Sequence, residues 1–311
     1  MNRRSALRVL LGAGAVSYFK RSAKADKPAG QQDFVIHSDV RLVLLDVSVK
    51  NKDGGWVTGL SKSNFQVAEN GVPQDITVFA RNDIPVTVGI LVDNSRSMTP
   101  NMGEVLTAAT TFVEESNPHD EIFVLNFNET VKRGLPPDVL FSDDIKQLRM
   151  ALFRGIPEGR TALNDAVVDG LEQLKLGKRD KKTLVLISDG GDNASHHKRP
   201  EMLELVEGSL ATIYTIGLFE TGDLDRDPGI LKKLAKVSGG LAFFPENPRD
   251  MTEACRQIAK DIRTRYTVGY PPPPKGGAIR HVRVRVSAPD HGALVARTRQ
   301  IYRYEEPANQ N

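Results

Sequence analysis

Five oxygen-bearing side chains in this sequence have types and positions that suit metal chemistry. Asp93, Ser95 and Ser97 stand at alternate positions in the stretch "GILVDNSRSMTP", and Thr161 and Asp189 occupy two later stretches. Together they offer two carboxylates and three hydroxyls, with no thiolate. Hard divalent cations such as Mg²⁺, Mn²⁺ and Ca²⁺ prefer oxygen ligands, whereas structural zinc prefers nitrogen and sulfur. The sequence therefore predicts a divalent-metal site, provided that the fold brings the three stretches together.

The elements around these residues are expected to bring them to one place. The middle of the chain, residues 83–265, alternates apolar strand-like runs with amphipathic helical stretches; "VTVGILVD" ends at Asp93 and "KTLVLISD" ends at Asp189. This alternation indicates an α/β fold, a Rossmann-like doubly wound and mainly parallel sheet with helices on both faces. In such a sheet, ligands bind outside the carboxyl ends of the strands. We therefore expect both aspartates to face one crevice, with Thr161 at the start of a helix beside them.

Each stretch also has an ordinary structural interpretation when it is taken alone. Asp-x-Ser before a helix is a common helix cap, Thr161 suits a cap as well, and "SDGGDN" suits a turn. Only the combination of all three stretches, in this order and at strand ends, favours the metal site.

The middle of the chain resembles a von Willebrand factor type A domain. That family has a metal-ion-dependent adhesion site made of a D-x-S-x-S motif, a threonine from a second loop and an aspartate from a third. Here "DNSRS" supplies Asp93, Ser95 and Ser97, "GRTALNDAV" supplies Thr161, and "LVLISDGGDN" supplies Asp189. The resemblance implies that these five residues hold a divalent cation, with Mg²⁺ favoured over Mn²⁺ or Ca²⁺. It also implies a protein partner that presents an Asp or Glu carboxylate.

Such a site works because the bound cation keeps much of its positive charge. If the hydroxyls bind the cation directly and the aspartates act partly through water, the cation keeps both this charge and an open coordination position. A partner carboxylate then completes the shell, and charge-assisted bonds in a partly desolvated cleft give affinity and orientation. The family resemblance assigns this role to the site, and the spacing alone permits it. The expected function is an exported, metal-dependent protein-binding or adhesion module without catalytic residues.

Two other functions remain open at this point. A metal-dependent phosphohydrolase with Asp93 as nucleophile usually needs a second acid nearby to protonate the leaving group, but Ser95 stands two positions later. The sequence also contains no G-x-S-x-G elbow and no glycine-rich phosphate loop. Alternatively, the metal has a purely structural role, in which it holds the loops of a scaffold together and takes no part in binding.

Strand patterns dominate the two segments that flank the middle. Asn70-Gly71 lies between two short apolar runs, which is a strong signal for a hairpin. In "HVRVRVSA", valine alternates with basic residues, so Val282, Val284 and Val286 are expected to point inward.

Size predicts that the flanks fold together. Neither 26–82 nor 266–305 is long enough to bury a stable core alone. We therefore expect the two flanks to pair into one small β-sandwich with 83–265 inserted, followed by a tail at 306–311. The flanks also resemble a bacterial group of secreted A-domain-related proteins typified in acidobacteria.

The start of the chain has the composition of an export signal. Residues 1–25 hold six basic residues and no acidic one, a short apolar run and the small-residue pattern "AKA". Arg3 and Arg4 resemble a twin-arginine signal, and the apolar run is too short for a membrane span. Removing this segment takes the formal net charge from +3 to −3, and this argues against nonspecific nucleic-acid binding. We expect a periplasmic or secreted protein with no stable membrane span after cleavage.

Three further groups have a functional and a plainer interpretation. Asp165 either orients the site or is a solvated charge or a charge in the first turn of a helix. Asp192, His196 and His197 form either a second metal site or an exposed loop. A basic strand face either meets an acidic partner or the anionic cell envelope or is simply solvated; it comprises Arg283, Arg285, Arg297 and Arg299.

Overall fold

The computed structural model describes residues 42–81, 83–219 and 225–304. The export signal expected at 1–25 and the tail expected at 306–311 lie outside these described residues. No helix in the described ranges is long and apolar enough to cross a membrane.

A mainly parallel sheet forms the centre of the segment 83–265. In the described residues it has six strands in the order β10-β9-β8-β5-β6-β7, and only β7 is antiparallel to its neighbour. The chain runs from the central strand β5 to β6 and β7 on one side, and then crosses to β8 on the other side. The strands are β5 (Val86–Asp93), β6 (Glu121–Phe127), β7 (Val131–Arg133), β8 (Lys181–Ser188), β9 (Thr212–Gly217) and β10 (Ala242–Phe243).

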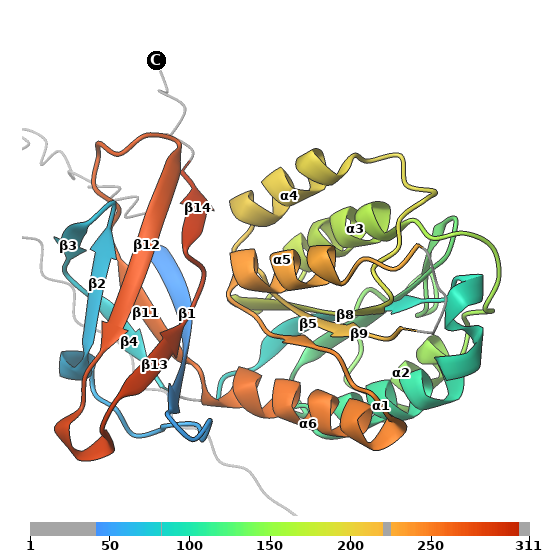
Figure 1. Ribbon diagram of the computed structural model, residues 1–311, viewed down its shortest axis with the longest axis horizontal. Coiled ribbons are helices and arrows are strands. Elements are labelled where there is room, and N and C mark those ends of the chain that lie inside the picture. The colour runs from blue at the N-terminus through green and yellow to red at the C-terminus, as the bar shows by residue number, and fades with distance from the viewer. Residues whose placement is uncertain (1–41, 82, 220–224, 305–311) are drawn as a thin grey trace, which may run out of the picture. The chain divides into compact units, whose positions relative to one another are not determined.

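Helices cover both faces of this sheet, as Figure 1 shows. One face carries α1 (Met102–Glu114), α2 (Ile145–Leu152) and α6 (Pro248–Thr264). The other carries α3 (Leu163–Lys175), α4 (Arg199–Gly208) and α5 (Pro228–Ser238). A short 3₁₀ segment, η2 (Arg96–Asn101), connects β5 to α1.

The burial pattern explains why these segments form these elements. All eight residues of β5 are buried, as a strand between two helical layers requires. In α3, Leu163, Val167, Leu171 and Leu174 recur at helical spacing and are buried. Strands and helices share one hydrophobic core. The predicted doubly wound α/β fold is confirmed.

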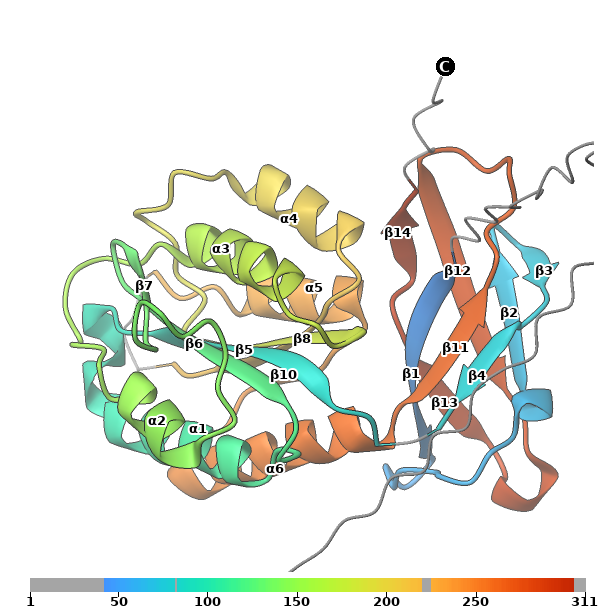
Figure 2. The ribbon, with the colours of Figure 1, turned by 180° about the vertical axis from the view of Figure 1, so that it is seen from behind.

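The two flanks of the chain pair with each other, as Figure 2 shows. They form two antiparallel four-stranded sheets within the described residues, in the orders β13-β1-β11-β4 and β14-β12-β2-β3. Each sheet mixes strands from before and after the central domain, since β1 pairs with β11 and β2 pairs with β12. The strands are β1 (Val43–Asn51), β2 (Phe65–Glu69), β3 (Val72–Gln74), β4 (Val78–Ala80), β11 (Tyr266–Tyr270), β12 (Ile279–Val286), β13 (Leu294–Arg297) and β14 (Ile301–Arg303). Their buried side chains form a second core, so the predicted sandwich is confirmed.

Local chemistry sets two features of this sandwich. Asn70 and Gly71 connect β2 to β3 and adopt φ values of 47° and 82°, the left-handed region that a type I′ hairpin turn needs at both positions. Along β12, Val282 is buried and Val284 and Val286 are half-buried, while the basic residues between them are exposed.

Two arginines of the predicted basic face turn inward instead. Arg297 donates to the buried carboxylate of Asp261, with both distances at 2.8 Å. Arg299 is buried and donates to the carbonyl oxygens of Ser209 and Ala211. The expectation of an outward basic face is therefore wrong for these two residues, because acceptors from the central domain bind them.

Candidate functional site

The site lies where two neighbouring parallel strands end. β5 ends at Asp93, and β8 ends at Ser188, one residue before Asp189. The two strands pair directly, with Val92 opposite Ile187. From β5 the chain continues to β6 on one side of the sheet and later returns to β8 on the other side, so the strand order reverses between β5 and β8. Open parallel sheets bind ligands at this reversal point.

Asp93 lies beneath the surface and holds the first loop in place. Its carboxylate is fully buried, accepts a hydrogen bond from the Ser95 backbone N–H at 2.8 Å, and accepts another from the Ser188 hydroxyl at 2.6 Å. Burial and the nearby carboxylate of Asp189 raise the pKa of Asp93 from its usual 3.8 to about 7. A cation beside the two carboxylates would oppose this shift, because it favours their ionised forms.

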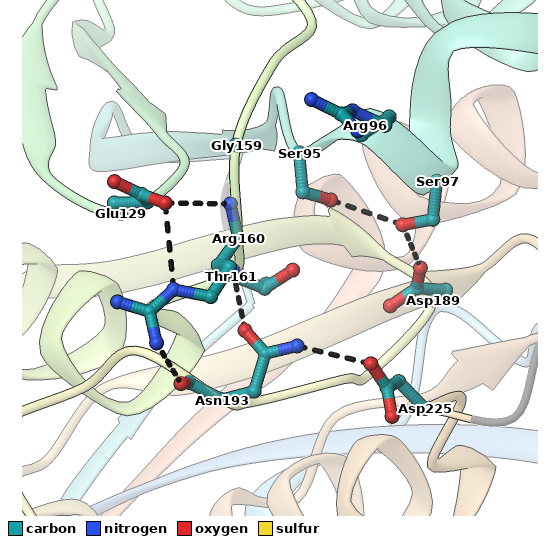
Figure 3. A pocket seen from close by; sticks show the side chains of 10 residues that line it. All are labelled: Ser95, Arg96, Ser97, Glu129, Gly159, Arg160, Thr161, Asp189, Asn193 and Asp225. Carbon is teal, nitrogen blue, oxygen red and sulfur yellow. Dashed lines mark hydrogen bonds and ion pairs between the residues drawn. The ribbon is translucent and has the colours of Figure 1, made fainter.

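The hydroxyls of Ser95 and Ser97 and the carboxylate of Asp189 follow one another in a chain of contacts, as Figure 3 shows. The two Oγ atoms are 3.1 Å apart, and Ser97 Oγ donates to Asp189 Oδ2 at 2.5 Å. Ser95 occupies the N-cap position of η2, but its side chain makes no capping hydrogen bond. The helix-cap interpretation thus gives the position of Ser95 correctly but not the role of its hydroxyl.

Thr161 joins the same group from the start of α3. The N-cap of α3 is Ala162, so Thr161 is not the cap that its position suggested. Its backbone N–H donates to Asn193 Oδ1 at 3.0 Å, and its carbonyl oxygen accepts from the N–H of Asn193 at 2.9 Å. In Figure 3 its hydroxyl is directed toward the side of the pocket where Ser97 and Asp189 lie.

These side chains line a pocket of about 480 Å³. Four of the five predicted residues are on its wall, and Asp93 lies behind it. The complete wall comprises Ser95, Arg96, Ser97, Glu129, Gly159, Arg160, Thr161, Asp189, Asn193 and Asp225.

Sequence reasoning missed the residues that frame the predicted group. Glu129 accepts from both the backbone N–H and Nε of Arg160, at 3.3 and 3.4 Å. Asn193 donates to Asp225 Oδ2 at 3.0 Å, besides holding Thr161. Asn193 ends the stretch "ISDGGDN", Arg96 lies within "DNSRS", and Gly159 and Arg160 begin "GRTALNDAV", but their residue types gave no reason to single them out. Glu129 and Asp225 lie on loops with no spacing that would mark them.

The donor set fits a hard divalent cation. Neighbouring oxygen ligands of an octahedral Mg²⁺ lie about 2.9 Å apart. The distances here, 3.1 Å from Ser95 Oγ to Ser97 Oγ and 2.5 Å from Ser97 Oγ to Asp189 Oδ2, are on both sides of that value. In the part of the chain that the structure describes, no three His, Cys, Asp or Glu gather into a metal-holding group. The candidate set is of another kind, since hydroxyls outnumber carboxylates in it.

Asp165 lies in the first turn of α3, as one interpretation expected, but it is not a solvated charge. Only 14% of its side chain is exposed, and its two oxygens contact the Nδ1 atoms of His196 and His197 at 3.1 and 2.8 Å. It also accepts from both histidine backbone N–H groups. Asp165 therefore ties the loop that carries Asn193 to the first turn of α3.

A family of known domains and one curated relative match parts of this chain. Residues 88–191 match the family described as von Willebrand factor type A domain. The uncharacterized protein sll0103 of Synechocystis is 24% identical over 225 residues, which are 71% of this chain and 50% of that protein. The chain thus spans about half the length of this curated relative.

A solved structure shows the same fold, and a second one is similar over the central part of the chain. A von Willebrand factor type A structure from Catenulispora acidiphila has a TM-score of 0.51 at 14% identity, covering 84% of this chain and 74% of that one. The corresponding domain of the type V pili tip protein Mfa5 from Porphyromonas gingivalis has a TM-score of 0.49 at 14% identity, covering 58% and 95%. With its parallel sheet, its two helical layers and its matching motifs, the central domain of this chain is a von Willebrand factor type A domain.

Proposed function

We propose that this protein is an exported, divalent-metal-dependent binding module that recognises a carboxylate of a protein partner. The observation that carries the proposal is one pocket lined by the hydroxyls of Ser95, Ser97 and Thr161 together with the carboxylate of Asp189. Domains of this family generally mediate protein–protein interaction. The proposal gives that general role a specific site and chemistry.

Each residue of the proposed adhesion site has a distinct part. The neutral hydroxyls of Ser95, Ser97 and Thr161 would hold the cation without cancelling its charge. Asp93, buried behind the pocket with both oxygens hydrogen-bonded, would keep the first loop in place and balance charge from a distance. When bound, the Mg²⁺ would supply the positive charge that attracts an Asp or Glu side chain. Mn²⁺ and Ca²⁺ are alternatives that accept the same oxygen ligands.

The charges of the pocket wall make the cation necessary for an acidic ligand. The wall carries Arg96 and Arg160 but also Glu129, which pairs with Arg160, and the carboxylates of Asp189 and Asp225. A bound divalent cation would therefore supply the positive charge that attracts a partner carboxylate. The composition of residues 1–25 supports export, and the near-neutral remainder disfavours nucleic acid as a partner.

The competing functions make different demands on the same pocket. A phosphohydrolase needs an exposed nucleophile and a second acid, but Asp93 is fully buried and Ser95 takes the second position. The proposal is therefore binding without catalysis. A purely structural metal would change the stability of the fold on removal and leave partner binding intact.

The first test is a calorimetric titration of the metal-stripped chain, lacking residues 1–25, with Mg²⁺, Mn²⁺ and Ca²⁺. We expect saturable binding at one site in the wild type and at least about tenfold weaker binding in Ser97→Ala, since one ligand is lost. Thr99→Ala is the matched control: it removes a hydroxyl from the same loop, but that hydroxyl contacts the Arg96 carbonyl and does not line the pocket. Absence of binding by a folded wild type would refute the proposal.

A further inference from the structure

Three large apolar side chains are exposed on and after α2. Met150, Phe153 and Ile156 expose 61%, 58% and 68% of their surface. They recur every third residue, at the end of the helix and in the loop that follows it. The opposite side of α2 supplies the core, since Leu148 and Leu152 are fully buried. We call Met150, Phe153 and Ile156 the α2 patch.

The loop after α2 connects the patch to the metal pocket. The Glu158 N–H donates to the Asn94 carbonyl at 2.9 Å, and the Arg96 N–H donates to the Gly159 carbonyl at 3.2 Å. Asn94 and Arg96 belong to the D-x-S-x-S loop, and Gly159 lines the pocket. Two backbone hydrogen bonds thus hold the chain beyond the patch against the metal-binding loop.

The distance from patch to pocket is short. Ile156 precedes Gly159 by three residues and Phe153 precedes it by six, so their Cα atoms lie within about 10 Å and about 20 Å of Gly159. An extended segment of three to six residues spans the same distances. A bound segment with its carboxylate in the pocket can therefore bring its next residues onto the α2 patch.

The composition of the patch favours a protein partner. Met, aromatic residues and Arg are enriched in the cores of protein interfaces, and Arg149 and Arg154 are exposed on the same stretch. Asp143 and Asp144 are exposed at the start of α2. This mixture of signs is unlike the uniformly basic, amphipathic surface that anionic membranes attract.

We propose that the α2 patch is the specificity surface of the metal pocket. It binds large apolar side chains that a partner segment carries three to six positions from the Asp or Glu held at the metal. This inference rests on the proposed function, because the carboxylate anchors the segment. The inference adds to that function the kind of acidic segment that the protein selects.

The test uses labelled ten-residue Gly-Ser peptides with blocked ends, measured by fluorescence anisotropy in Mg²⁺ and in EDTA. One peptide carries Asp with Leu three and Phe six positions away, and it is made in both chain directions. A second carries the same Asp with Ser at both other places, and a third replaces Asp with Asn. We expect the wild type in Mg²⁺ to bind the apolar acidic peptide, in one direction, at least about tenfold more tightly than the Ser peptide.

Two matched variants test whether the α2 patch produces the higher affinity for the apolar acidic peptide. Met150→Ser/Phe153→Ser/Ile156→Ser should bind both acidic peptides equally, with an unchanged affinity for the Ser peptide. Leu176→Ser/Leu210→Ser/Val295→Ser removes three similarly exposed apolar residues elsewhere and should keep the gain. Thermal melting checks that both variants are folded.

The outcomes separate this inference from the proposed function. Equal binding of both acidic peptides by the wild type, or a gain that survives in the patch variant, overturns the role of the patch and leaves the metal site standing. Absence of Mg²⁺-dependent binding by either acidic peptide overturns both proposals. Metal-independent binding of the Asn peptide, or wild-type dimers that the patch variant abolishes in light scattering, assigns the patch to another ligand and overturns the inference.

Discussion

At the scale of single residues, the site separates the atoms that hold the loop from the atoms that face the ligand. Asp93 and Ser188 hydrogen-bond to each other below the pocket, while Ser95, Ser97 and Asp189 line it. Ser188 also accepts from the Gly190 N–H at 3.0 Å, so it connects the first loop to the third. The burial of this pair fixes where the exposed hydroxyls lie.

Ser188→Ala should lower the free energy of unfolding by about 1–3 kcal/mol, because it leaves a buried carboxylate oxygen without its hydrogen bond. Urea denaturation measures the change. Ser63→Ala is the control, since its hydroxyl contacts only the exposed Ser61 hydroxyl. Equal stability changes in the two variants would show that Ser188 is not needed to hold the loop.

The contact with Asp165 should give His197 a higher pKa in the folded protein than in the unfolded chain. The hydrogen bond from His197 to the Asp165 carboxylate raises the pKa of that histidine above its ordinary 6.5. Protonation therefore stabilises the fold: the contribution is complete below pH 6.5 and is lost as the pH rises through the higher folded-state pKa. NMR titration should show that Asp165→Asn lowers the pKa of His197, whereas the distant Asp290→Asn leaves it unchanged. The same pKa in Asp165→Asn and the wild type would contradict this account.

At the scale of elements, the loop after α2 is fitted closely to the metal-binding loop. A Cβ atom on Gly155 would stand 2.1 Å from Asn94 Oδ1, and the Asn94 amide is itself held by Asn126. No side chain fits at position 155 unless the Asn94 side chain leaves its hydrogen bond to Asn126 or one of the two loops moves.

Gly155→Ala should therefore destabilise the protein by about 1–3 kcal/mol, the usual effect of overpacking, and should weaken Mg²⁺ binding. Gly103→Ala is the matched control, because a Cβ there meets no atom within 4 Å and lies in the first turn of α1. Chemical denaturation and metal titration of both variants test this. A Gly155→Ala protein as stable as Gly103→Ala would mean that the loops separate easily.

Sequence patterns predicted those features that depend on near neighbours along the chain. The Asn70-Gly71 hairpin follows from turn chemistry, and the alternation along β12 follows from a strand with one solvated face. Ser188 could not be recognised, because in sequence it is one more residue at the end of an apolar strand. Arg299 was placed in solvent, because its acceptors at Ser209 and Ala211 are distant in sequence. Tertiary partners were predicted only where a motif marked them, as for Ser97 and Asp189, and those without such a mark were missed.

At the scale of the whole molecule, one buried carboxylate joins the central domain to the sandwich. Asp261 of α6 accepts from Ser48 at 2.6 Å and from Tyr214 at 2.7 Å, and the two sides of the junction supply Arg265 and Arg297. Burial alone would raise the pKa of Asp261, but the two arginines hold it well below its usual range. The carboxylate is thus ionised at neutral pH, and the described residues on both sides of it behave as one compact unit.

Asp261→Ala should cost about 3–5 kcal/mol in the free energy of unfolding, because it leaves two largely buried arginines without their carboxylate. Trp56, the single tryptophan of the chain, donates its Nε1–H to Asp261 at 3.0 Å, so its fluorescence reports on the junction directly. Urea denaturation followed by Trp56 emission and by circular dichroism should give one transition in the wild type. In Asp261→Ala, the emission should change at lower urea than the helical signal, because the sandwich is released first.

Asp290→Ala removes an exposed carboxylate from the sandwich and is the control for lost charge. Coincident transitions with a small loss of stability in Asp261→Ala would mean that the apolar contacts of α6 hold the two parts together without the ion pairs. Since α6 also packs against α1, which begins just after the metal-binding loop, the Mg²⁺ affinity of Asp261→Ala tests whether the junction affects the pocket. An affinity equal to that of the wild type would show that the two ends of the central domain act independently.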